Sequence, residues 1–126
     1  KQYNIPSHID KIDFKEKCDI IISATFHKKI DLDKCNYNLA VNMHPSLLPY
    51  LKGKDPIMEA LNKKIKKLGL TTHKLTNIYD SGEYLFREKI NFNFKNSKKD
   101  VITKLIPLYE KHTTKLLKYY KENYEV

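Results

Sequence analysis

The sequence predicts an α/β fold, in which a mixed β-sheet is flanked by helices and the functional site lies at strand ends. Two observations predict this class: short runs rich in β-branched residues, typical of strands, alternate with segments whose apolar residues recur at helical spacing. The chain of 126 residues has the size of one domain, and 40% of its residues are hydrophobic. We therefore expect residues 1–126 to form a single domain.

Two strands are expected in the first part of the chain. Residues 19–25 contain three consecutive isoleucines after a charged stretch, which is typical of a strand buried on both faces of a sheet. Residues 39–43 form a second such run, and the polar segment 28–37 between them predicts a brief helix or loop. Residues 44–54 contain two prolines and a glycine, so we predict a long irregular loop there, where α/β sheets carry their sites.

One helix is expected directly after this loop. Asp55 is a suitable N-cap residue, and Pro56 has the fixed φ that suits the first helical position. The apolar residues that follow recur at helical spacing. Glycine is common just beyond a helix C-terminus, so we predict that this helix ends at Gly69.

The last part of the chain predicts two strands and a long helix. Residues 70–76 and 84–90 have the composition of strands joined by a short loop. From Ser97 onward apolar residues recur at helical spacing to the end of the chain. Proline has no N–H to donate within a helix, so Pro107 is expected to kink or restart this helix.

Composition disfavours several classes of partner. The longest apolar run is about as short as residues 20–22, whereas a bilayer span needs roughly 20 apolar residues. The net charge is +9, but Arg87 is the only arginine, and nucleic-acid recognition favours the bidentate arginine fork. We therefore expect neither a membrane nor a nucleic-acid partner.

The scattered histidines and the two cysteines lack the spacing of metal ligands, so no metal ion is expected. Cys18 and Cys35 are interpreted as buried thiols in a reducing compartment. The chain begins with neither a methionine nor an apolar leader. We therefore expect a cytoplasmic protein, with this chain beginning part-way through a longer one.

Three polar residues at strand ends give the sharpest functional signal. Asn42 and His44 are two positions apart in an extended segment, so both side chains lie on one face, and Pro45 keeps His44 extended. Asp80 follows on a later loop. An amide can stabilise an oxygen that becomes negative during acyl transfer, and a histidine can move a proton there. The three residues suit attack of an amine on an acyl carbon, although each is singly also a common turn residue.

Several segments resemble the folate-dependent formyltransferase superfamily. Its signature loop is similar to NMHPSLLPYLKG at residues 42–53, and its second motif is similar to YDSGE at residues 79–83. The similarity extends through DIIISATFHKKI, DPIMEAL and GLTTHKLT at residues 19–30, 55–61 and 69–76. The resemblance implies a Rossmann-like catalytic domain in which the amine of a substrate receives a formyl group from 10-formyltetrahydrofolate.

The resemblance also implies roles for individual residues. The catalytic Asn, His and Asp of the superfamily correspond to Asn42, His44 and Asp80. The pterin of the formyl donor is expected near two segments, which contain His27, Lys28, Ile30, Asn77 and Tyr79. For His27 and Lys28, an exposed strand end is the alternative interpretation.

The acceptor is expected to be a small-molecule amine, and two features favour a nucleotide-linked amino sugar. Residues 52–57 resemble the sugar and methionyl-tRNA branches of the superfamily, whereas His73 resembles the sugar and purine branches. Three alternatives stay open: a glycinamide ribonucleotide formyltransferase, a deformylase that uses water, and a non-catalytic folate-binding module. Members of the superfamily normally carry about half of the domain before the segment matched here, and the sheet edge left open by its loss would favour a homodimer.

Overall fold

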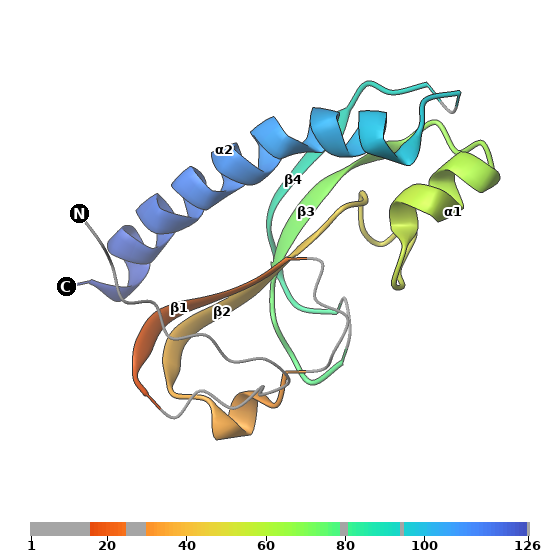
Figure 1. Ribbon diagram of the computed structural model, residues 1–126. Coiled ribbons are helices and arrows are strands. Elements are labelled where there is room, and N and C mark those ends of the chain that lie inside the picture. The colour runs from red at the N-terminus through yellow and green to blue at the C-terminus, as the bar shows by residue number, and fades with distance from the viewer. Residues whose placement is uncertain (1–15, 25–29, 79–80, 94, 126) are drawn as a thin grey trace.

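The computed structural model describes residues 16–24, 30–78, 81–93 and 95–125. They form a four-stranded sheet in the order β1-β2-β3-β4. Strands β1 and β2 are parallel, while β3 is antiparallel to both β2 and β4. The bounds are Cys18–Ala24 for β1, Tyr37–His44 for β2, Leu68–Lys74 for β3 and Tyr84–Ile90 for β4. The mixed sheet confirms the predicted α/β class, and Figure 1 shows the long helix α2 running along one face of it.

Strands β1 and β2 are the two runs that the sequence predicts, joined by a short 3-10 helix at Leu32–Lys34. The expected burial of β1 on both faces is wrong for the described residues. Ile21 is 8% exposed, but Ile22, on the other face of the strand, is 41% exposed. Strand β1 forms an edge of the described sheet, and helix α2 packs chiefly on β2, β3 and β4, so this face of β1 is less covered than that of β2.

Helix α1 covers Pro56–Asn62 and begins as predicted, since the Asp55 side chain accepts a hydrogen bond from the Met58 N–H. The prediction that this helix ends at Gly69 is wrong. The chain turns at Lys64, which has a φ of 54°, and the Ile65 N–H donates to the Ala60 carbonyl. This pair of features is a Schellman C-cap with a lysine where glycine is usual, so nothing in the local sequence marked it.

Gly69 lies instead within β3, whose observed bounds start two residues before the predicted segment 70–76. A Cβ atom at Gly69 would overlap the carbonyl oxygen of Glu88 on β4 and crowd the Leu47 side chain. Glycine is needed there because a neighbouring strand and a loop approach the backbone closely.

Helix α2 covers Lys98–Tyr124 and begins with a capping box between Ser97 and Asp100. The predicted restart at Pro107 is not seen, because α2 runs through this residue as one helix. Pro107 and Thr103, whose carbonyl loses its usual helical partner, are both exposed, so water can solvate that carbonyl. No helix in the described part of the chain is both long enough and apolar enough to cross a membrane.

The buried face of α2 packs on the sheet through two groups of apolar side chains. One lies between the N-terminal half of α2, helix α1 and strands β2 and β3, and it includes Met43, Leu70 and Leu105. The other joins Leu116 and Tyr120 of α2 to Leu39 and Val41 of β2. The predicted burial of both cysteine thiols is wrong, since Cys18 and Cys35 are only half-buried.

One polar residue, His112 of α2, lies within this apolar layer. It is fully buried, and a hydrogen bond of 2.7 Å joins its Nδ1 to Thr72 Oγ1 on β3. Its Nε2 has no hydrogen-bond partner among the described residues. Burial lowers the pKa of His112, because the charged imidazolium loses its hydration there.

This lowered pKa predicts acid sensitivity. The unfolded chain binds a proton at His112 more readily than the folded chain, so stability should fall as the pH drops below about 6.5, by up to about 1.4 kcal/mol per pH unit. His112→Asn, which places an amide near the position of Nδ1 and does not titrate, should remove this part of the dependence. Urea unfolding of both proteins between pH 5 and about 7.5 measures the difference, and equal slopes would contradict the prediction.

Candidate active site

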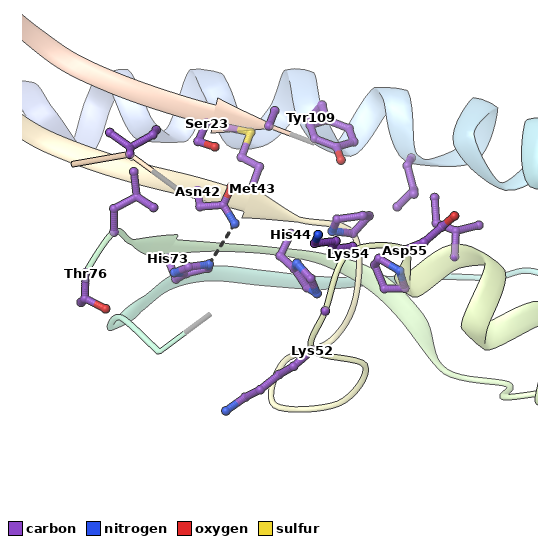
Figure 2. A pocket seen from close by; sticks show the side chains of 18 of the residues that line it. Ser23, Asn42, Met43, His44, Lys52, Lys54, Asp55, His73, Thr76 and Tyr109 are labelled. Atoms are coloured by element: carbon purple, nitrogen blue, oxygen red, sulfur yellow. Dashed lines mark hydrogen bonds between the residues drawn. The ribbon is translucent and has the colours of Figure 1, made fainter. Parts of the chain in front are cut away.

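Strand β2 places Asn42 and His44 on one face of the sheet, as the sequence predicts. The antiparallel register sets Asn42 opposite His73 and His44 opposite Thr71. Met43, between them, points to the opposite face and packs in the core beneath α2. Figure 2 shows Asn42, His44 and His73 beside the cleft at the end of β2.

The Asn42 amide is oriented by His73. Its Nδ2 lies 3.2 Å from His73 Nε2, and His73 Nδ1 lies 3.0 Å from the Lys74 carbonyl oxygen. A carbonyl only accepts, so Nδ1 carries the proton and Nε2 must accept from Asn42. One N–H of Asn42 is thereby fixed on His73, which is 1% exposed, and the second N–H can donate to a ligand. No local sequence pattern indicates this contact, because it depends on the register of β2 against β3.

The His44 ring is held in the same way. His44 is 5% exposed, and its Nε2 lies 2.8 Å from the carbonyl oxygen of Leu51. Because this carbonyl can only accept, Nε2 carries a proton in both the neutral and the charged ring. Nδ1 is therefore the nitrogen that carries no proton in the neutral ring.

The loop after β2 is fixed to the sheet by buried hydrogen bonds. Thr71 Oγ1 donates to the Ser46 carbonyl at 2.7 Å and accepts from the Leu48 N–H at 3.1 Å. Arg87 of β4 donates from Nε to the Leu48 carbonyl at 2.9 Å. The predicted irregular loop is therefore a rigid support for the end of β2.

Replacing Thr71 by valine should release this loop. The change keeps the shape of the side chain but leaves two buried backbone groups without their partner, so unfolding free energy should fall by about 1–3 kcal/mol. Denaturant unfolding measures the loss. Thr114→Val is the matched control, because the Thr114 hydroxyl bonds only within the exposed surface of α2. Equal effects of the two substitutions would contradict the role of Thr71.

A cleft of about 960 Å³ opens at the carboxyl ends of the parallel strands β1 and β2. Its volume suits a small organic ligand. Four residues that the sequence predicts for the site line it: Asn42, His44, Ile30 and Asn77. The other four, His27, Lys28, Tyr79 and Asp80, lie outside the described residues.

The described lining of the cleft is basic and partly apolar. Lys52, Lys54 and Lys98 contribute to it, and its single described carboxylate, Asp55, is paired with Lys98 at 2.9 Å. Tyr109 of α2 lies on the apolar side. Burial raises the pKa of Tyr109 to about 12, so its hydroxyl stays neutral and can act only through hydrogen bonds near neutral pH.

Comparison with known protein families shows to which family the chain belongs. Residues 5–114 match the Formyl transferase family. The chain belongs to this family. The resemblance stated from the sequence motifs is thereby confirmed.

Similar proteins within the family carry different names. A methionyl-tRNA formyltransferase of Wigglesworthia glossinidia brevipalpis is 30% identical over 119 residues, which are 83% of this chain and 37% of that protein. A phosphoribosylglycinamide formyltransferase of Bacillus halodurans is 29% identical, with a TM-score of 0.51 over 55% of this chain and 36% of that one.

The fold is shared more widely. A 4-N formyltransferase of Francisella tularensis, 23% identical, superimposes with a TM-score of 0.64 over 80% of this chain and 43% of that one. The chain spans 25% to 37% of the length of the first curated relatives that it matches. The described structure thus corresponds to part of the formyltransferase fold.

Proposed function

We propose that the protein containing this chain transfers a formyl group from 10-formyltetrahydrofolate to the amino group of a nucleotide-linked amino sugar. One observation carries the proposal: the Asn42 amide and the His44 imidazole lie on one face at the end of β2, at the cleft, each held by a fixed partner. Membership in the family supports the reaction type.

The two residues have complementary tasks. The bound donor supplies the formyl carbon that the amine attacks, and the bond from that carbon to the donor nitrogen then breaks, so that tetrahydrofolate leaves. Asn42 donates its second N–H to the formyl oxygen as negative charge develops there, and protonated His44 donates to the same oxygen. Asp80, which lies outside the described residues, is proposed to stabilise the charged His44 ring by its own negative charge and to relay the proton released by the amine to the departing donor nitrogen.

The donor is proposed to lie on the side of the cleft formed by the segments after β1 and β3. Ile30 and Asn77 line this side together with Leu75 and Ile78. The apolar side chains suit the faces of a ring, and the polar side chain suits its edge. His27, Lys28 and Tyr79 belong to the same two segments and complete the proposed donor site.

The sugar acceptor rests on the motifs at residues 52–57 and on His73. Purified protein is incubated with the formyl donor and, separately, with a nucleotide-linked amino sugar, glycinamide ribonucleotide or water alone, and products are identified by mass spectrometry. We expect the N-formyl sugar. Turnover of glycinamide ribonucleotide with none of the sugar would overturn the acceptor, and formate release in water alone would assign a deformylase.

The second candidate is transfer to glycinamide ribonucleotide. The observation that favours it is the 29% identity to the Bacillus halodurans enzyme, whose name states that acceptor. The same assay decides between the two acceptors. Binding of the donor with no transfer to any acceptor by the full-length protein would instead assign a folate-binding module without catalysis.

A further inference from the structure

We propose that Leu51 is a positioning residue, whose backbone carbonyl determines which ring nitrogen of His44 takes part in proton transfer. The inference rests on the proposed role of His44 in proton transfer. Leu51 has a φ of 57°, in the left-handed region that costs a leucine about 1 kcal/mol or more. Residues held in this region cluster at functional sites, where the strain serves a geometry.

The geometry that this strain serves is the direction of the Leu51 carbonyl. The Leu51 carbonyl oxygen turns back across the loop to accept from His44 Nε2 at 2.8 Å. The Leu51 side chain packs against the core cluster beneath α1 and α2, which explains why a leucine occupies a position that glycine would adopt more readily. Packing holds the strained backbone, and the strained backbone holds the imidazole.

The chemical consequence is a fixed tautomer. With Nε2–H bonded to Leu51, the neutral His44 ring presents an Nδ1 lone pair, and the charged ring presents an Nδ1 proton. If the carbonyl turned away, both tautomers would be populated and the ring could rotate. Leu51 therefore acts on the reaction through His44 and touches no substrate.

The test compares substitutions that differ in their tolerance of positive φ. Leu51→Asn and Leu51→Gly remove the apolar contact but favour the left-handed region, whereas β-branched Leu51→Val disfavours it. In the full-length enzyme we expect the Asn and Gly variants to stay within about threefold of the wild-type kcat. The Val variant should lose about tenfold or more in kcat with little change in KM. Losses that instead follow side-chain size would overturn the inference.

A second readout needs no turnover. The ¹⁵N shifts of the His44 ring in this chain report its tautomer directly. We expect a single Nε2–H form in the wild type and in Leu51→Asn, and mixed forms in Leu51→Val. A wild-type His44 with its proton on Nδ1 would overturn the inference even if the Val variant fails to fold.

His44→Gln separates the two proposals in the same assay. Full activity of His44→Gln would refute the catalytic role of His44 and this inference with it. An inactive His44→Gln beside a fully active, folded Leu51→Val would refute only the positioning role of Leu51.

Discussion

Asn42→Ala should lower turnover by about 100-fold or more in the complete enzyme, because it removes a donor aimed at the oxygen that becomes negative. The effect should appear in kcat rather than KM, since the interaction strengthens as charge develops. His73 would lose the partner of its Nε2 as well, so the substitution also removes the fixed contact at 3.2 Å. Steady-state kinetics with saturating donor measure the loss.

The control for this substitution lies on the same strand. Asn38 is an exposed asparagine of β2 whose amide donates to the Tyr120 hydroxyl, away from the cleft. Asn38→Ala should leave kcat within a factor of about two. Comparable losses for both variants would mean that the strand, and not the Asn42 amide, is responsible.

His44→Gln should lower kcat by about 10²- to 10⁴-fold, the usual range for loss of a general acid or base. Glutamine places an N–H close to the position of His44 Nε2, so the contact with Leu51 and the loop should persist. Glutamine cannot gain or lose a proton near neutral pH. The substitution therefore removes the proton transfer while keeping the local fold.

Two measurements make this result specific. The circular dichroism spectrum and the affinity for a stable donor analogue should match those of the wild-type protein. Under those conditions, a kcat within threefold of the wild type would contradict the assignment of His44.

The sequence predicted secondary structure correctly where the local residue pattern determines it. Strand β4 occupies the predicted residues 84–90, and α1 begins at the predicted cap because Asp55 and Pro56 act on their immediate neighbours. Gly69 misled the prediction because glycine serves both as a helix cap and as a close contact between backbones. Only the packing of Leu47 and of β4 against it tells the two apart.

Within the site, too, some features follow from local sequence and others only from tertiary structure. The shared face of Asn42 and His44 follows from the two-residue repeat of a strand and could be predicted. Their partners His73 and Leu51 could not, because the first depends on antiparallel register and the second on a positive φ at a leucine. The sequence thus predicts which side chains face the cleft, while tertiary structure determines the partners that orient them.

The central claim is that Asn42 and His44 face the formyl group of a bound donor. A titration of this chain with 5-formyltetrahydrofolate, followed by ¹H–¹⁵N NMR, tests it most directly. We predict the largest shift changes at the Asn42 side-chain amide and the His44 ring, with smaller changes at His73 and Asn77. Binding that shifts signals far from the cleft while leaving Asn42 and His44 unchanged would contradict the claim.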